Sequence, residues 1–171
     1  MSAPAHTRMR PAPDEVLEGV YDPEIPVLTI ADLGILRSVG LDGSSRVQVV
    51  ITPTYSGCPA MDAIRDDIKA ALAEAGYLDV SITTVLAPAW TTDWITARGR
   101  ARLAEFGIVP PHPAGPSGPV PLILHVRRPD VACPQCGSAD TAEVSRFSST
   151  ACKAAYVCRS CREPFDYFKA L

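Results

Sequence analysis

Four cysteines near the end of this 171-residue chain have a spacing that could hold a metal ion. They form two C-x-x-C pairs, Cys133 with Cys136 and Cys158 with Cys161. Two such pairs separated by about twenty residues are typical of a zinc ribbon, in which each pair supplies two thiolates to a tetrahedral ion. Because a segment this short cannot bury enough surface to fold alone, we expect structural zinc to provide much of its stability.

The metal in this tail has one alternative, because an iron–sulfur cluster also binds four cysteine thiolates. The geometry of the paired turns favours zinc. Cys152 lies between the two pairs and could replace one of their ligands in a cluster, but we predict that it is an unreactive core residue. His125, upstream of the first pair, is expected on a strand rather than at the metal.

The remaining cysteine, Cys58, stands alone in the first half of the chain. It follows a β-branched strand and the loop Thr52-Pro-Thr-Tyr-Ser-Gly, and Pro59 is expected to be the first residue of an amphipathic helix. Free backbone N–H groups and the positive end of a helix dipole favour a thiolate at such a position. We therefore predict a reactive or metal-transferring thiol, with a small apolar residue packed under the loop as the alternative.

An acidic loop offers candidate partners for Cys58. The segment Tyr21-Asp-Pro-Glu-Ile-Pro26 is stiffened by two prolines, and its Asp22 and Glu24 could serve as metal or proton partners of the thiol. An Asx-type turn at Asp22 is the alternative, and turn chemistry favours it. Thr54, inside the Cys58 loop, is the third candidate helper.

The elements that position Cys58 follow from hydrophobic periodicity. Asp42-Gly43 predicts an antiparallel hairpin, and the order strand, helix, strand predicts a right-handed parallel crossover. Gly76 is expected to end the central helix. The fold class is therefore α+β: a small mixed sheet in α-β-β-α-β order with its helices on one face, followed by the zinc ribbon. The expected elements are a helix at 14–20, strands at 35–41 and 46–51, a helix at 59–75 and a strand at 78–86.

Two tryptophans lie close together after the last of these strands. Trp90 and Trp94 flank the start of a further predicted helix that ends near Phe106, with Gly107 as its stop. They are candidates for a partner interface, since tryptophan is enriched in binding hot spots, while core packing is favoured for at least one of them. The expected caps of this helix are Thr91, Thr92 or Asp93.

Proline and glycine divide the chain into four parts. Residues 109–121 contain a dense cluster of both, which prevents helix and strand alike, so this segment is predicted to be a semi-rigid linker. A flexible N-terminus at 1–13, an α+β domain at 14–108 and the zinc ribbon at 122–171 complete the arrangement.

Composition excludes several classes of function. The net charge is −3, so no overall positive field draws the protein to nucleic acid or to an anionic membrane. The arginines of the predicted helix, Arg98, Arg100 and Arg102, are interpreted as a solvated face. No apolar run approaches the roughly 20 residues of a membrane span, and the N-terminus lacks the apolar region of a secretory signal. We therefore expect a cytoplasmic protein.

Several motifs together resemble one bacterial family. They are Asp22-Pro-Glu-Ile-Pro26, Asp32-Leu-Gly34, Thr52-Pro-Thr-Tyr-Ser-Gly-Cys-Pro59, Trp90-Thr-Thr-Asp-Trp-Ile-Thr96 and the paired C-x-x-C tail. This set resembles the PaaD (PaaJ) proteins, which are encoded with the phenylacetyl-CoA epoxidase, the diiron oxygenase of aerobic phenylacetate degradation. The N-terminal part is similar to the wider iron–sulfur-assembly domain of the SufT type, whose single shared cysteine matches Cys58.

The resemblance implies an accessory protein without catalysis of its own, which matures or repairs an iron–sulfur or diiron centre of the epoxidase system. Cys58 would bind iron or a cluster transiently, assisted by Asp22, Glu24 or Thr54. A lone cysteine offers too few thiolates for a stable cluster, so a homodimer or a client complex is expected. The expected clients are the epoxidase subunits or the reductase, and the iron–sulfur assembly machinery is the expected supplier.

Three other functions have less support in the sequence. A non-catalytic docking or structural subunit of the oxygenase would use Cys58 for packing and the Trp90/Trp94 region as its interface. A cysteine-nucleophile enzyme needs a base near Cys58, but the histidines lie in a tail, a linker and the second unit. These histidines are His6, His112 and His125. Nucleic-acid binding through the ribbon lacks the basic composition it needs.

Overall fold

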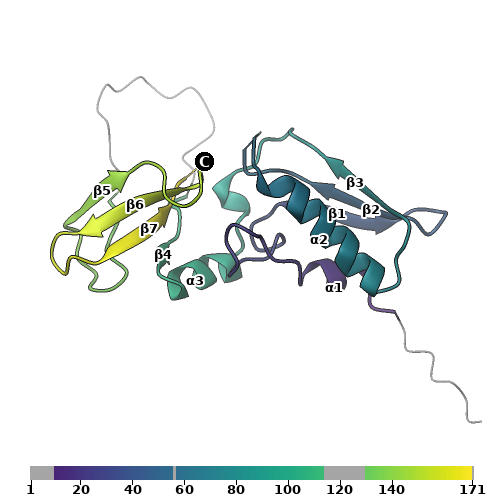
Figure 1. The fold of residues 1–171 in the computed structure, drawn as a ribbon, viewed down its shortest axis with the longest axis horizontal. Helices are drawn as coiled ribbons and strands as arrows, with labels where there is room; N and C mark the ends of the chain where they lie inside the picture. The colour runs from purple at the N-terminus through teal and green to yellow at the C-terminus, as the bar shows by residue number, and fades with distance from the viewer. Residues whose placement is uncertain (1–9, 56, 114–129, 171) are drawn as a thin grey trace, which may run out of the picture.

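A three-stranded mixed sheet forms the N-terminal unit of the computed structural model, which describes residues 10–55, 57–113 and 130–170 (Figure 1). β1 (Leu36–Leu41) pairs antiparallel with β2 (Val47–Ile51), and β3 (Val80–Thr84) pairs parallel with β2. Val49 in the central strand lies opposite Val39 on one side and Ile82 on the other. The predicted fold class, a mixed sheet followed by a zinc ribbon, is confirmed.

The crossover helix buries one face of this sheet. α2 (Ala60–Glu74) turns Ile64, Ile68 and Leu72 inward, and all three are fully buried. They meet the alternate residues of β2 that point to the same side, and α1 (Pro13–Leu17) packs beside α2. Each fully buried aliphatic side chain contributes about 2 kcal/mol to stability. This core holds the strand β2 and the helix α2 in place, and therefore the loop between them.

The bounds of several elements differ from the sequence predictions. α1 ends at Leu17 rather than at residue 20, because the amides of Gly19 and Val20 bond in tight turns at its end. Pro59 is the N-cap of α2 rather than its first residue. β3 is shorter than the predicted strand at 78–86. In the β1–β2 hairpin, the residue with positive φ is Ser45 (φ 66°) rather than Gly43, so the loop is longer than a two-residue turn.

The predicted helix after Trp90, the third in the chain, consists of two pieces with separate caps. A 3₁₀ turn, η1 (Thr92–Trp94), is capped by Thr91, whose hydroxyl accepts the amide of Asp93. α3 (Ala97–Glu105) is capped instead by Thr96, whose hydroxyl accepts the amide of Gly99 at 2.9 Å. The prediction of the cap at 91–93 is therefore wrong for α3. Gly107, with φ +83°, lies just beyond its end as predicted.

A four-stranded sheet forms the C-terminal unit, in the order β4-β7-β6-β5. The strands are β4 (Ile108–Val109), β5 (Thr141–Ser145), β6 (Lys153–Cys158) and β7 (Pro164–Phe168). β4 runs parallel to β7, so Val109 belongs to this sheet and the predicted linker does not begin there. The rest of that linker beyond residue 113, the predicted domain start at Leu122 and His125 lie outside the described residues.

The two units share one hydrophobic core. Ile108, Cys152 and Phe168 belong to the same buried cluster as the inner residues of the first sheet. The ring of Phe168 lies 6.3 Å from that of Trp90, centroid to centroid. Figure 1 shows that β6 starts on the side of the N-terminal unit and runs away from it. The ribbon is therefore packed against the unit that carries Cys58.

Candidate metal and thiol sites

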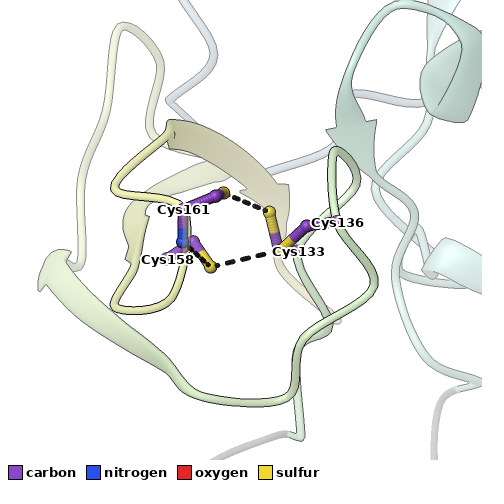
Figure 2. A group of neighbouring side chains, drawn as sticks. All are labelled: Cys133, Cys136, Cys158 and Cys161. Carbon is purple, nitrogen blue, oxygen red and sulfur yellow. Dashed lines mark hydrogen bonds between the residues drawn. The ribbon is translucent and has the colours of Figure 1, made fainter.

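The four paired cysteines converge at the end of the ribbon that lies away from the N-terminal unit (Figures 1 and 2). All four Sγ atoms of Cys133, Cys136, Cys158 and Cys161 lie within 4.8 Å of one another. The closest pairs, Cys133 with Cys161 and Cys136 with Cys158, are 3.6 Å apart. With zinc–sulfur bonds of about 2.3 Å, the edge of a tetrahedron of four sulfurs around zinc is about 3.8 Å. The donor set therefore fits a structural metal site with four cysteine ligands, as the sequence predicts.

Backbone hydrogen bonds shape the turns that carry these thiols and influence their pKa values. Gly137 has φ +72°, and its amide closes the first turn on the carbonyl of Cys133 at 2.9 Å. The amide of Cys161 donates to Cys158 Sγ at 3.4 Å and is the main cause that lowers the pKa of Cys158 to about 6. A backbone hydrogen bond from Glu163 lowers the pKa of Cys161, but burial and the neighbouring thiols raise it to about 12. Four negative thiolates are thus stable together only with a cation between them.

Cys58 lies in the loop between β2 and α2, immediately before the N-cap. Its amide bonds the carbonyl of Tyr55 at 3.2 Å, and its carbonyl accepts the amide of Met61 at 3.4 Å. The Ala60 amide and the Thr54 hydroxyl both act to lower the pKa of the thiol. The residue is only partly exposed and packs against the main core. The helix N-terminus therefore does reach the thiol, as its position in the sequence predicts.

The charge state of Cys58 contradicts the prediction of a favoured thiolate. Burial is the largest influence and raises the pKa of the thiol, and the carboxylates of Glu24 and Asp22 raise it further. These effects outweigh those of the Ala60 amide and the Thr54 hydroxyl, which lower the pKa. Burial and negative charge both disfavour a second anion. The thiol is therefore protonated at neutral pH unless a cation binds beside it.

The acidic loop contains an Asx-type turn, and its two carboxylates influence the pKa of Cys58. Asp22 is 5% exposed, and its Oδ1 accepts the amides of Glu24 at 2.9 Å and Ile25 at 2.8 Å, which confirms the Asx-type turn. Burial raises the pKa of Asp22. Burial and the charge of Asp22 raise the pKa of Glu24, whereas Lys153 of the ribbon lowers it. Both carboxylates act on Cys58, while a role as metal partners stays a prediction.

Sequence reasoning missed three residues near this site. The pKa of Tyr55 is raised by burial first, and then by the charges of Cys58, Glu24 and Cys152. Cys152 is 4% exposed in the core, as predicted, but the same two carboxylates act on it. Lys153 pairs with Asp166 at 3.1 Å beside Glu24. No spacing rule links residues 58 and 152, because only tertiary packing brings the ribbon to this loop.

Trp90 is buried in the core, whereas Trp94 is only partly buried. Trp90 is 6% exposed and donates its indole N–H to the carbonyl of Leu33 at 2.9 Å, which is the position of a core residue. Trp94 is partly buried, and the guanidinium of Arg37 lies 3.6 Å from its ring centroid. Gly34 has φ +72°, and a Cβ on it would lie 2.7 Å from Trp94. An interface role stays a prediction only for Trp94.

The arginines of α3 are wrongly predicted as a solvated face. Arg98 and Arg102 bind the two oxygens of the fully buried Asp32 at 2.7 and 2.8 Å. Thr96 donates to the same carboxylate at 3.1 Å. Arg100 donates to the carbonyls of Thr92 and Pro111 at 2.8 Å. These bonds attach α3 to the Asp32-Leu-Gly loop, which a pattern of exposed arginines does not reveal.

Two further predictions concern histidines and membranes. His112 lies 3.2 Å from the Tyr167 hydroxyl in the ribbon sheet, and His6 and His125 are outside the described residues. Within residues 10–55, 57–113 and 130–170, no helix has the length and apolar character needed to cross a membrane.

Comparisons with known proteins match both units. A family model described as an iron–sulfur cluster assembly protein matches residues 14–84, and a PaaD zinc beta ribbon domain matches residues 119–169. A protein of Escherichia coli strain K12, provisionally named as a subunit of the 1,2-phenylacetyl-CoA epoxidase, is 50% identical over 91% of this chain and 90% of its own.

The N-terminal unit has relatives of its own. An Fe-S protein maturation auxiliary factor of Porphyromonas gingivalis is 34% identical over 52% of this chain and 84% of its own length. The crystal structure of a domain of unknown function, DUF59, from Bacillus anthracis superposes with a TM-score of 0.50 and 26% identity, over 53% of this chain and 87% of that one. Because similarity to the E. coli protein spans almost the entire chain, this protein belongs to the PaaD family, with a SufT-like iron–sulfur-assembly domain followed by the PaaD zinc ribbon.

Proposed function

We propose that this protein is a maturation factor that delivers or repairs an iron–sulfur or diiron centre of a phenylacetyl-CoA epoxidase system. The observation that carries the proposal is the setting of Cys58, a partly buried thiol under the influence of two carboxylates. Such a setting resists a free thiolate but attracts a metal cation, which replaces the proton on sulfur and offsets the negative charge.

The same setting argues against a catalytic nucleophile. Nucleophilic cysteines need a lowered pKa and a base within hydrogen-bond reach. Here burial and the charges of Glu24 and Asp22 raise the pKa of Cys58, and the described histidine, His112, bonds to Tyr167 instead. Reaction with an electrophile is therefore slow at neutral pH. Ligation of iron also has to displace the proton on sulfur, but the bound cation then stabilises the thiolate and offsets the negative charge of the two carboxylates.

Transient binding follows from the small number of ligands. A stable cluster takes four cysteine thiolates, whereas the loop after β2 supplies one. Cys58 can thus accept a cluster from an assembly protein and release it to a client that supplies more thiolates. During exchange each receiving thiol loses a proton, the departing thiolate gains one, and the iron keeps its oxidation state. A homodimer or a client complex completes the site in the meantime.

Names of the relatives support this choice of pathway and clients. The P. gingivalis relative is named as an Fe-S protein maturation auxiliary factor, and the E. coli relative is named as an epoxidase subunit. The clients are accordingly the epoxidase subunits or their reductase, and the iron–sulfur assembly machinery is the donor. The ribbon metal, zinc, has a structural role, since all four of its ligands are cysteines of the ribbon and leave no position open.

A docking subunit without cluster chemistry is the second candidate. It is favoured by one observation, the name of the E. coli relative, which calls that protein a subunit. In this case Cys58 packs the loop and the partly buried Trp94 contributes to the interface. Loss of the thiol would then leave the oxygenase complex fully active.

The test is metal analysis and an optical spectrum of protein purified without oxygen, for the wild type and for Cys58→Ala. Asp66→Asn, an exposed carboxylate of α2 paired with Lys69, is the matched control. The expected result is about one zinc per chain in all three proteins and an iron–sulfur absorption band in the wild type and the control only. Zinc alone in all proteins, with full oxygenase activity of the Cys58→Ala complex, would instead establish the docking subunit.

A further inference from the structure

One turn of the ribbon exposes a phenylalanine to solvent. Residues 146–152 connect β5 to β6 at the end of the ribbon that packs against the N-terminal unit (Figure 1). Phe147 in this turn is 64% exposed, and Val144, the extra residue of a bulge in β5, is 68% exposed. Single exposed apolar residues are common on protein surfaces, so exposure alone assigns them no role. The contacts that hold Phe147 distinguish it from such residues.

Hydrogen bonds fix the main chain on both sides of Phe147. The hydroxyl of Ser145 accepts the amide of Phe147 at 3.2 Å and donates to its carbonyl at 2.7 Å. The amide of Ser148 donates to the carbonyl of Lys153 at 3.0 Å, and the Ser148 hydroxyl donates to Oδ1 of Asp166 at 2.6 Å. The backbone of Phe147 is therefore fixed before any partner binds. Side chains that are ordered beforehand lose less conformational entropy on binding.

A lysine just beyond β7 fixes the ring of Phe147. The ammonium group of Lys169 lies 4.4 Å from the centroid of this ring and donates to the carbonyl of Arg146 at 3.0 Å. The amide of Lys169 donates to the carbonyl of Cys152 at 2.9 Å, which holds the lysine against the same turn. A cation over an aromatic face is attracted by the ring. The ring and the ammonium group are therefore presented together.

Positive charge exceeds negative charge around this ring. In the part of the chain that the structure describes, neither Arg146 nor Lys169 forms an ion pair. Burial lowers the pKa of Lys169 most and the charge of Arg146 lowers it too, while Cys152 and Glu143 oppose them. Two cations thus face one carboxylate, in a protein whose net charge is −3. We call the following residues the ribbon patch: Val144, Arg146, Phe147 and Lys169.

The chemistry of the ribbon patch selects among possible partners. A ring beside two cations fits a protein segment that places an apolar side chain on the ring and carboxylates on the cations. A nucleic acid fits less well, because two cations give few phosphate contacts and the negative net charge of the chain repels a polyanion. A stable homodimer buries about 800 Å² on each subunit, which is more than four side chains supply, whereas transient complexes bury less.

We propose that the ribbon patch is a docking site for an acidic segment of the client protein. Phe147 is its apolar anchor, and Arg146 and Lys169 bind the carboxylates of the segment. This inference rests on the function proposed above and names the surface that recognises the client. The ribbon then selects the client, while Cys58 in the other unit handles the metal. Because the patch lies at the end of the ribbon that packs against that unit, the docked client is held next to it.

The experiment measures the binding of purified epoxidase subunits and reductase to zinc-loaded, full-length protein by isothermal titration calorimetry. The variants are Phe147→Ala and Arg146→Glu, and the controls are Leu78→Ala, an exposed leucine, and Lys69→Glu, an exposed cation of α2. Phe147→Ala should weaken binding about 30-fold, as the loss of a hot-spot residue does.

Charge reversal provides an independent readout of the same surface. Arg146→Glu should weaken binding at least about 10-fold, because it places a like charge against the acidic segment. Added salt should weaken binding of the wild type more than that of Arg146→Glu. A zinc content of about one per chain and an unchanged unfolding temperature show that each variant is folded.

The outcomes separate this inference from the proposed function. Weaker binding by Phe147→Ala and Arg146→Glu, with both controls like the wild type, supports the docking site. Unchanged binding of both variants, or no binding of these clients to the wild type, overturns it, while an iron–sulfur band that depends on Cys58 would leave the maturation function standing. A wild-type dimer that Phe147→Ala converts to a monomer would assign the patch to a second copy, and RNA binding that Arg146→Glu abolishes would assign it to a nucleic acid. Either result also overturns the proposal.

Discussion

At Cys58 the acidic loop and the helix N-terminus act on the charge of the thiol in opposite directions. Burial, Glu24 and Asp22 raise the pKa, whereas the amide of Ala60 and the hydroxyl of Thr54 lower it, and the first group prevails. A helix start by itself therefore does not identify a reactive thiolate. The residues that face the thiol from other segments decide the result.

Removal of one carboxylate should make the thiol more reactive. We expect Glu24→Gln to lower the pKa of Cys58, since Glu24 is the larger of the two negative influences. A partly exposed charge of this kind is worth about 1 kcal/mol, or roughly a five-fold increase in thiolate. The measurement is the rate of iodoacetamide labelling of Cys58 at pH 8, followed by peptide mass spectrometry on zinc-loaded protein.

Two other carboxylates, Asp22 and Asp66, provide the controls for this prediction. Asp22→Asn keeps an oxygen that can accept the amides of Glu24 and Ile25, so the turn survives while the charge is lost, and the rate should also rise. Asp66→Asn, on the exposed face of α2, should leave it unchanged. In the wild type, the labelling rate of Cys58 should continue to rise at pH values above the ordinary pKa of a thiol, because the pKa of Cys58 is raised. Equal rates in the wild type and Glu24→Gln would contradict the argument.

Asp32 is the residue on which α3 depends. It is fully buried and binds Arg98 and Arg102. Burial raises its pKa, but the hydrogen bonds from Arg98, the Thr29 amide and Thr96 lower it overall. Breaking a buried ion pair costs about 3–5 kcal/mol, and the partial exposure of both arginines places Asp32→Asn near the lower end. Urea unfolding at pH 7 measures this loss of unfolding free energy.

The pH dependence gives a second test of Asp32. A carboxyl whose folded pKa is lowered stabilises the protein above its unfolded pKa, and this stability is lost as the pH falls through the folded pKa. The difference between the wild type and Asp32→Asn should therefore shrink below about pH 4. Asp79→Asn, which removes an exposed pair with Arg46, should cost less than about 1 kcal/mol at any pH. A constant difference down to pH 2 would rule out the charge as the cause.

Among the elements, the ribbon depends most directly on its metal. We expect Cys136→Ser to lose zinc, since serine is a poor substitute for a thiolate in a site of four cysteines and the three remaining thiols keep one position open. Zinc content after dialysis against a chelator measures the loss. Ser160→Ala, which removes only a hydrogen bond to Ser138, is the control and should retain the metal. Retention of full zinc by Cys136→Ser would show that Cys136 is not a ligand.

Local signals were sufficient for most elements of the fold. The alternation in β2, the periodicity of α2, the C-terminal glycine at Gly76 and the paired cysteines predicted the sheet, the crossover and the ribbon. The predictions that failed depend on distant parts of the chain. Val109 forms a strand because β7 lies beside it, and Arg98, although its side chain is half exposed, is held by an ion pair because the buried Asp32 is its partner. The effect of Glu24 and Asp22 on the pKa of Cys152 has the same origin, since it requires the packing of the two units.

For the whole molecule, Phe168 should couple the ribbon to the N-terminal unit. It is fully buried, contacts the ring of Trp90 at 6.3 Å, and precedes Lys169, whose amide holds Cys152. We expect Phe168→Ala to cost about 3–5 kcal/mol of unfolding free energy, because a large cavity opens where the two units meet. The emission of Trp90 should shift to longer wavelength as water reaches the ring.

A second phenylalanine separates coupling from simple destabilisation. Phe165 is also buried, but it stacks on Tyr156 at 5.8 Å within the ribbon cluster. Phe165→Ala should therefore weaken the ribbon without changing the emission of Trp90. In both variants the zinc content should stay near one per chain, because the four ligands lie within the ribbon. An unchanged Trp90 spectrum in Phe168→Ala would show that the two units fold independently, so that the packing of Phe168 on Trp90 does not couple the ribbon to the unit that carries Cys58.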